Sequence, residues 1–258
     1  MITTVLFDMG GTLEDIWVDA ESDAAAIAKL DAMLKARGMD PGLSLDKLKA
    51  SVDEGWKRYD AVRSAQDVEL KPVQIWCDYV LTDFSFDRGR LAPCCEEIAH
   101  MWEVTHFHRC LRPRVPEMLS RLRDMGLKLG VISNTAALYQ VFDTLEEYQI
   151  RDYFRDVTLS SVTGFRKPCR DIFTVSLRQM RSDPSECVYV GDTVSRDVIG
   201  SKKAGFAVAI QIGSKLTREK DVRVADALSP DYYIDDIYDV ADVVQGLLRA
   251  QTGECARG

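Results

Sequence analysis

The chain has 258 residues, 46% of them hydrophobic and 29% charged, with a formal net charge of −8; this balance is typical of a globular protein with a large core and argues against an extended nucleic-acid-binding surface. The first residues are not expected to form a signal peptide, and no apolar run approaches the roughly 20 residues of a membrane span. The seven cysteines are irregularly spaced, which is typical of reduced thiols. Together these features predict a cytoplasmic protein with no nucleic-acid or membrane partner. They leave its oligomeric state open.

A strand and a long helical block come first along the chain. Residues 3–7 predict a buried strand. From about Asp19 to Cys110 the apolar residues follow helical spacing and predict four helices. Residues that end, cap or open helices mark their limits, namely Gly38, Ser44, Pro72 and Pro93. This block therefore separates the first strand from all later strands.

After Pro116, strands and helices alternate. The expected strands are 127–132, 157–159, 187–190 and 207–212, and the expected helices are 117–125, 138–145, 171–180, one that ends at Lys203, and 240–248. Such alternation predicts right-handed crossovers and a parallel sheet covered on both faces. The predicted fold class is therefore α/β: a doubly wound parallel-sheet core from residues 1–16 and 112–250, an inserted all-helical cap from 17–111, and a flexible tail over 251–258.

Distinctive polar residues lie at the ends of the predicted strands or in the adjoining loops. They are Asp8 with the following Gly10, Gly11 and Thr12; Ser133 with Asn134; Lys167; and Asp192 with Asp197. Each residue alone is common in turns and helix caps. Ligands of open α/β sheets, however, bind at the carboxyl ends of the strands. The inserted helical block leaves the sheet at that edge, so we expect it to lie over the site as a lid.

Taken in order, these segments resemble the four motifs of the haloacid dehalogenase (HAD) superfamily, in the branch whose helical cap lies between the first and second motifs. The matching segments are Phe7-Asp8-Met9-Gly10-Gly11-Thr12-Leu13, Val131-Ile132-Ser133-Asn134, Gly164-Phe165-Arg166-Lys167-Pro168, and Val190-Gly191-Asp192-Thr193 through Asp197 to Ala204-Gly205-Phe206. The resemblance implies a HAD-like α/β core over most of the chain. The cap resembles the family only in position, size and helical character.

The resemblance also implies the role of each residue. Asp8 would be the nucleophile that forms an aspartyl-phosphate, with Ser133 and Lys167 as the other catalytic residues. Mg²⁺ would be held by Asp8, Asp192 and the backbone carbonyl of Gly10, with Asp197 as a direct ligand or a support. Substrate would be bound by Gly11, Thr12, Ser133, Asn134 and Lys167. These roles predict a Mg²⁺-dependent hydrolase of a small phosphorylated metabolite.

Gly10 departs from the pattern of this family. Most of its phosphatases have an aspartate there, which protonates the leaving alkoxide and later activates water. Glycine can do neither, although its backbone carbonyl can still bind Mg²⁺. A positioned general acid or base contributes about 10²–10⁴-fold in rate, or roughly 3–5 kcal/mol of barrier. The chain therefore lacks a catalytic group that would be costly to lose.

Three explanations for this departure stay open. The substrate could have a good leaving group, such as an acyl phosphate, and need no acid. Another carboxylate could supply the proton, from Glu14, Asp15, Asp53 or Glu54, although Glu14 and Asp15 are expected to form an exposed linker. Finally, the protein could have lost turnover and act as a phosphate-ligand binding or regulatory protein.

Two other branches of the family also lack this aspartate. Dehalogenases need no metal and do not keep the pattern of Gly191 and Asp192, which argues against dehalogenation here. Phosphonoacetaldehyde hydrolases keep Mg²⁺ and use a cap lysine as a Schiff base. The lysines in the corresponding region are Lys47, Lys49 and Lys57. Because their surroundings do not match that branch, we expect all three on a solvated face, and C–P bond hydrolysis remains an alternative.

Overall fold

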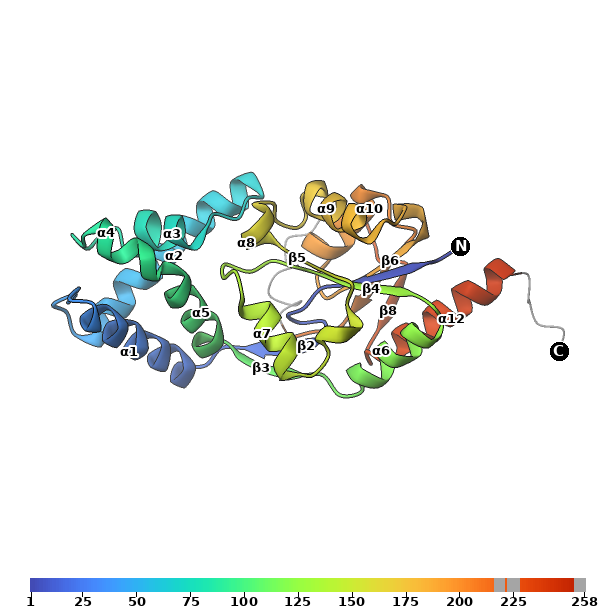
Figure 1. Cartoon of the computed structure of the whole chain (residues 1–258), viewed down its shortest axis with the longest axis horizontal. Helices are drawn as coiled ribbons and strands as arrows, with labels where there is room; N and C mark the ends of the chain where they lie inside the picture. Colours follow the sequence, from blue (N-terminus) through green and yellow to red (C-terminus); the bar gives the residue numbers. More distant parts are fainter. Residues whose placement is uncertain (216–220, 222–227, 253–258) are drawn as a thin grey trace.

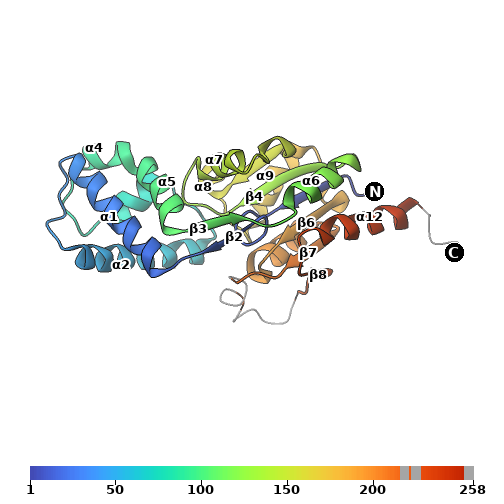
Figure 2. The same ribbon diagram turned by 90° about the horizontal axis from the view of Figure 1, so that it is seen from below.

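The computed structural model describes residues 1–215, 221 and 228–252. Its helical part lies at one end of the molecule and its sheet with flanking helices at the other, and a pair of short strands joins them (Figures 1 and 2). Within the described part of the chain, no helix combines the length and apolar character needed to cross a membrane.

The larger part is built on a sheet of six strands in the order β5-β4-β1-β6-β7-β8. The strands are β1 (Thr4–Phe7), β4 (Lys128–Ser133), β5 (Asp156–Leu159), β6 (Cys187–Gly191), β7 (Val208–Ile212) and β8 (Tyr232–Ile234). Every neighbouring pair is parallel, which confirms the predicted α/β fold class. The edge strand β8 was not predicted, because it is short and two of its three residues are exposed.

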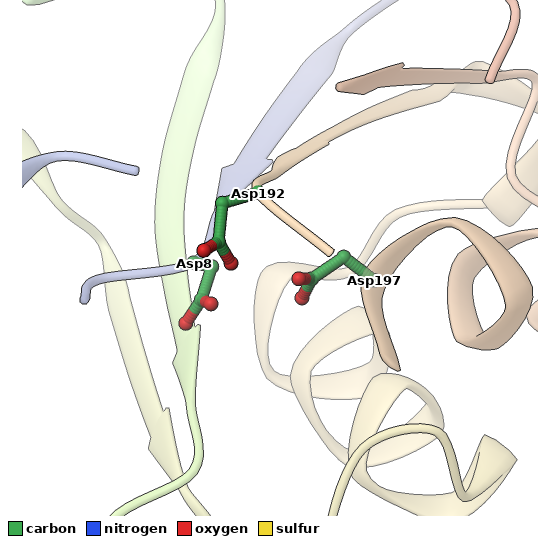
Figure 3. Close-up of side chains that lie close together, drawn as sticks. All are labelled: Asp8, Asp192 and Asp197. Carbon is green, nitrogen blue, oxygen red and sulfur yellow. The ribbon is translucent and has the colours of Figure 1, made fainter. Parts of the chain in front are cut away.

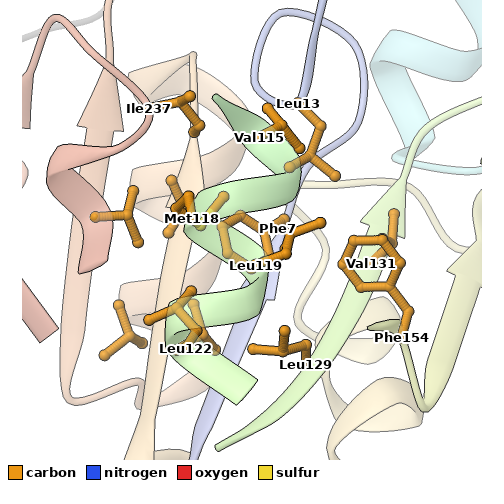
Figure 4. Close-up of a cluster of buried hydrophobic side chains, with 14 of the residues drawn as sticks. Phe7, Leu13, Val115, Met118, Leu119, Leu122, Leu129, Val131, Phe154 and Ile237 are labelled. Carbon is orange, nitrogen blue, oxygen red and sulfur yellow. The ribbon is translucent and has the colours of Figure 1, made fainter. Parts of the chain in front are cut away.

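Helices cover both faces of this sheet. One face packs against α6 (Val115–Asp124), α7 (Gln140–Glu147) and α12 (Asp239–Thr252), and the other against α9 (Arg170–Met180) and α10 (Ile199–Ala204). Side chains alternate along β1, so that Phe7 faces α6 (Figure 4) and Leu6 faces α9. Short helical turns complete this part: η3 (Arg151–Tyr153), α8 (Ser160–Thr163), η4 (Pro184–Glu186) and η5 (Val194–Val198).

The last helix is longer than predicted. It continues past residue 248 to Thr252, so helix extends over the first two residues of the predicted flexible tail. The side chain of Gln251 accepts a hydrogen bond from the backbone N–H of Ile2 at 2.8 Å, which ties this end of the helix to the start of β1. Residues 253–258 of the predicted tail lie outside the described residues.

The cap consists of helices packed around aromatic and aliphatic side chains. They are α1 (Ala20–Ala36), α2 (Leu45–Gln66), α3 (Pro72–Ile75) with the π-helical turn η1 (Trp76–Val80), α4 (Arg88–Leu91), η2 (Ala92–Cys94) and α5 (Cys95–His106). Trp56, Trp76 and Trp102 lie within 6.0 Å of one another, measured between ring centroids. The four predicted helices are all present, whereas the exact limits of the two domains remain a prediction.

Two short antiparallel strands connect the cap to the core. They are β2 (Glu14–Trp17) and β3 (His108–Leu111), paired from Glu14 with Leu111 to Trp17 with His108. The predictions of an exposed linker at Glu14 and of helix throughout the cap were therefore wrong at these positions. A strand of four residues gives too little alternation to be recognised in a sequence.

Candidate active site

Three carboxylates meet at the carboxyl edge of the sheet. Asp8 follows β1, Asp192 follows β6, and Asp197 lies in η5 (Figure 3). Each offers an oxygen within 4.8 Å of the others, and all three residues are buried. Asp8 and Asp192 meet because β1 and β6 are parallel and in register, with Phe7 beside Val190. Buried carboxylates at this spacing need a compensating cation, and oxygen ligands suit Mg²⁺.

Lys167 supplies one positive charge at this cluster. Its side chain is almost fully buried, and its Nζ lies 2.8 Å from Asp8 and 2.7 Å from Asp197. The side chain of Asn134 holds the Lys167 backbone at both ends: its amide donates to the carbonyl at 3.1 Å, and its oxygen accepts from the N–H at 2.9 Å. Asn134, predicted to bind substrate, thus also fixes the loop that carries Lys167.

Both carboxylate oxygens of Asp197 already have partners. One accepts from Lys167 at 2.7 Å, and the other accepts from the backbone N–H and the hydroxyl of Thr193 at 3.0 and 2.6 Å. Burial alone would raise the pKa of Asp197, but the positive charges of Lys167 and Arg196 hold it below its usual range. These contacts favour a supporting role in which Asp197 orients Lys167.

Asp8 is in a different electrostatic state. Burial raises its pKa above the usual value, and the charge of Lys167 opposes this only in part. One of its oxygens accepts from the Met9 N–H at 2.7 Å, which fixes the orientation of the carboxylate. A further positive charge beside Asp8 would favour its ionised form, as a bound divalent cation does.

Gly11 and Thr12 contribute to the packing beneath the carboxylates. Gly11 has a φ of +90°, and a Cβ at this position would overlap the side chain of Asp192. Only glycine therefore lets Asp192 approach the first motif so closely. Thr12 is fully buried. Neither residue is among those that line the adjacent cavity.

A cavity of about 570 Å³ opens above Asp8. Its floor includes Asp8, Gly10, Ser133 and Asn134, at the ends of β1 and β4. The opposite wall comes from the cap and the connecting strands, with Ile16, Trp17, Val18, Arg63, Glu103, Phe107 and Arg109. The structure thus encloses the predicted site between the core and the inserted segment. A cavity of this size accommodates a small metabolite.

Glu14 lies beside the position of the absent aspartate. A Cβ on Gly10 would have room, with the Ile16 side chain at 3.7 Å and a carboxylate oxygen of Glu14 at 3.8 Å as its nearest neighbours. Glu14 is fully buried, forms an ion pair with Arg109 and accepts from the Tyr148 hydroxyl at 3.0 Å. Burial raises the pKa of Glu14 above its usual value. Its carboxyl group therefore lies next to Gly10 and retains a proton more readily than an exposed glutamate.

The other candidate carboxylates are directed elsewhere. Asp15 lies 3.2 Å from Arg112 and lines a separate cavity of about 770 Å³ that does not include Asp8. Asp53 and Glu54 form ion pairs with Lys49 and Lys57 along α2. None of these three carboxylates lines the cavity above Asp8. Glu14 is thus the candidate that the fold brings closest to the first motif.

Several cavity residues were missed by sequence reasoning. Four arginines line the cavity, namely Arg63, Arg109, Arg166 and Arg196. Arg166 precedes Lys167 and Arg196 precedes Asp197, so their positions within the motifs were a signal that could have been used. Arg63 and Arg109 lie in α2 and β3 with no local pattern around them, and only the folded structure brings them to the site.

Comparisons with known proteins agree with this geometry. A family model described as haloacid dehalogenase-like hydrolase matches residues 2–205. The glyceraldehyde 3-phosphate phosphatase of Methanopyrus kandleri is 29% identical, over 96% of this chain and all of that protein. The phosphoglycolate phosphatase of Vibrio vulnificus is 25% identical over 94% and 96% of the two chains. The crystal structure of a 2-haloacid dehalogenase from Pseudomonas syringae superposes with a TM-score of 0.68 at 23% identity, covering 96% of this chain and all of that one.

Proposed function

The chain belongs to the haloacid dehalogenase-like hydrolases, and we propose that it is a Mg²⁺-dependent phosphatase of a small phosphorylated metabolite. One observation carries this proposal: the buried carboxylate of Asp8 lies 2.8 Å from Lys167 and beside two further carboxylates, at the open edge of the sheet. The names of the two phosphatases that match along nearly the whole chain support it.

In the proposed reaction, a carboxylate oxygen of Asp8 attacks the phosphorus atom of the substrate. A bond forms between this oxygen and phosphorus, the bond from phosphorus to the leaving group breaks, and an aspartyl-phosphate remains on Asp8. Water then attacks that phosphorus, releasing phosphate and the free carboxylate. Lys167 and Ser133 stabilise the charge on the phosphoryl oxygens. Bound Mg²⁺, held by Asp8, Asp192 and the Gly10 carbonyl, would supply further positive charge there.

The proton for the leaving oxygen has two candidate sources. The substrate could be an acyl phosphate or another anhydride, whose leaving group departs without a proton. Alternatively, Glu14 could deliver one through the space above Gly10, which its raised pKa and its position beside that space support. Because Glu14 does not itself line the cavity, this second route requires a bridging group between its carboxyl and the substrate.

Phosphate release from two model substrates tests the proposal. We expect Mg²⁺-dependent release from acetyl phosphate, and much slower release from p-nitrophenyl phosphate if no proton donor is available. Chelation of Mg²⁺ and substitution Asp8→Asn should each abolish both activities. Release that is unaffected by either treatment would contradict the proposed reaction.

The alternative functions make different predictions. A phosphate-ligand binding or regulatory protein would bind phosphorylated ligands tightly and turn over neither substrate. A hydrolase of phosphonoacetaldehyde would need a cap lysine at the cavity, but the lining residues include no lysine from the cap. Lys49 is paired with Asp23 and Asp53, and Lys57 is exposed. The geometry therefore favours the phosphatase over C–P bond hydrolysis.

A further inference from the structure

The lining of the cavity above Asp8 contains more basic than acidic side chains. Five basic side chains line it, namely Arg63, Arg109, Arg166, Arg196 and Lys215, against the carboxylates of Asp8 and Glu103. Lys167 lies beneath this surface, with its Nζ 2.8 Å from Asp8, and in the proposed reaction it contacts the transferred group. Each further arginine therefore needs an explanation from its own contacts.

Two of the arginines belong to other parts of the site. Arg109 forms ion pairs with two carboxylates, Glu14 and, at 2.8 Å, Glu103, whereas Arg63 and Arg166 each pair with one. Arg196 lies beside the catalytic carboxylates, and its Nε is 3.4 Å from the Thr193 hydroxyl. It thus belongs to the floor of the site, together with Lys167.

Arg166 is held firmly from behind by a buried carboxylate. Glu69, in the cap segment between α2 and α3, is fully enclosed and forms an ion pair with Arg166. Glu69 also accepts from the hydroxyls of Tyr59 and Ser160, the latter at 2.9 Å. A guanidinium anchored in this way keeps its orientation toward the cavity, since the groups that fix it are themselves fixed.

Arg63 approaches the same region from α2. Its guanidinium lies 5.3 Å from the ring centroid of Tyr59, the residue that also binds Glu69, and it pairs with Asp60 one turn earlier. Burial lowers the pKa of Arg166, and the neighbouring positive charge of Arg63 lowers it further. Both guanidinium groups line the cavity, and Tyr59 and Glu69 connect them, since Arg63 lies over the Tyr59 ring and Glu69 binds both Tyr59 and Arg166. Neighbouring guanidinium groups are typical of sites for carboxylate or phosphate.

We propose that Arg63 and Arg166 bind a second anionic group of the substrate. This inference rests on the proposed function, and it names the substrate class: a small phosphomonoester whose other end carries a carboxylate or a second phosphate. The phosphoryl group to be transferred lies against Asp8, Ser133 and Lys167, and the second anion lies against the wall formed by α2 and the loop before Lys167. A cavity of about 570 Å³ limits the distance between the two groups to that of a short carbon chain.

Two matched pairs of substrates test this inference on the Mg²⁺-loaded chain of 258 residues. The first pair is 3-phosphoglycerate and glyceraldehyde 3-phosphate, which differ by one carboxylate. The second is ribulose 1,5-bisphosphate and ribulose 5-phosphate, which differ by one phosphate. We expect kcat/KM to be higher for the doubly anionic member of at least one pair, on the order of tenfold or more, and the pair that responds identifies the second group.

The variant Arg63→Gln should reduce that preference to less than about threefold, mainly by raising KM for the doubly anionic substrate. Lys57→Gln is the matched control, because Lys57 lies on the same helix, is exposed and does not line the cavity. Equal kcat/KM within both pairs, or an equal effect of Arg63→Gln on both members, would show that the second-anion site is wrong. Acetyl phosphate turnover in the same preparations reports independently on the proposed function.

If the wild-type protein turns over none of the four paired compounds, their binding affinities test the second-anion site. The proposed function is overturned only if acetyl phosphate is not turned over either. Calorimetric titration with both pairs should then still give a lower Kd for the doubly anionic member of at least one pair, and Arg63→Gln should remove the difference. Equal affinities within both pairs would reject the second-anion site.

Discussion

The floor and the cap wall of the cavity hold their charges in different ways. On the floor, the side chains of Asp8 and Lys167 are at most 7% exposed and are fixed by neighbouring strand ends and loops. On the cap wall, the Arg63 side chain is 26% exposed, and Trp17 is 38% exposed. A rigid, dry floor suits charge stabilisation during phosphoryl transfer, whereas a more solvated wall suits the choice of substrate. Substitutions on the floor test this division.

The largest effect is expected from removal of the floor's nucleophile. Asp8→Asn keeps the size of the side chain but removes the attacking charge, so activity should fall on the order of 10⁴-fold or more. Phosphate release from acetyl phosphate with Mg²⁺ measures this, and circular dichroism verifies the fold. Asp124→Asn, an exposed position in α6, is the control and should retain normal activity. Substantial activity in the Asp8 variant would show that the chemistry is not on the floor.

Adjacent glycines provide the second test of the floor's rigidity. Gly11→Ala forces a side chain into a positive-φ position against Asp192, so we expect a loss of about 1–3 kcal/mol in the free energy of unfolding and weaker Mg²⁺ binding. Gly10→Ala has room for its methyl group and should be much milder. Urea denaturation and Mg²⁺ titration of both variants measure the difference. Equal losses of stability and of Mg²⁺ affinity in the two variants would show that the close packing of Asp192 against Gly11 contributes to neither.

Local sequence motifs predicted many residues of the cavity floor, but they did not predict the residues of the cap wall. Asp8, Ser133 and Asp192 each follow a recognisable buried strand, and parallel strands bring such residues to one edge. Glu14 was assigned to a linker because its strand has four residues and the partner strand lies more than 90 positions away in the chain. Arg63 sits in an ordinary amphipathic helix, and its place at the cavity depends on how α2 packs against the loop before Lys167, which no local pattern specifies.

The third prediction restores the missing group on the floor. Gly10→Asp should raise the rate on simple phosphomonoesters such as p-nitrophenyl phosphate by roughly 10-fold to 100-fold, below the full effect of a general acid, because the buried carboxylate of Glu14 lies close by. The rate on acetyl phosphate, which needs no proton donor, should change little. Steady-state rates on both substrates give the comparison. An unchanged or lower rate on p-nitrophenyl phosphate in a correctly folded variant would count against the absent acid as the limiting factor.

The smallest expected effect is on the pH dependence of protein stability, and it distinguishes Asp197 on the floor from Asp156, a buried carboxylate outside the site. Burial raises the pKa of Asp156, which accepts from the hydroxyls of Thr158 and Ser176 at 2.7 Å each, whereas Lys167 and Arg196 hold the pKa of Asp197 at about 2, although burial opposes them. The ordinary pKa of an aspartate, which applies to the unfolded chain, is 3.8. Because the pKa of Asp156 is raised in the folded protein, the stability that Asp156 contributes is present below pH 3.8 and is lost as the pH rises above it. Because the pKa of Asp197 is lowered, the stability that Asp197 contributes is present above pH 3.8 and is lost as the pH falls toward 2.

Wild-type protein should therefore lose stability relative to Asp156→Asn as the pH rises above 3.8. Relative to Asp197→Asn, it should lose stability as the pH falls below 3.8. Chemical denaturation of the three proteins with chelator present, at a series of pH values, measures both trends. The opposite signs follow from one difference in surroundings: Asp197 has a lysine at 2.7 Å, while the hydrogen-bond partners of Asp156 named above are neutral hydroxyls. If both variants showed the same sign, the ion pair with Lys167 would not set the charge state of the floor.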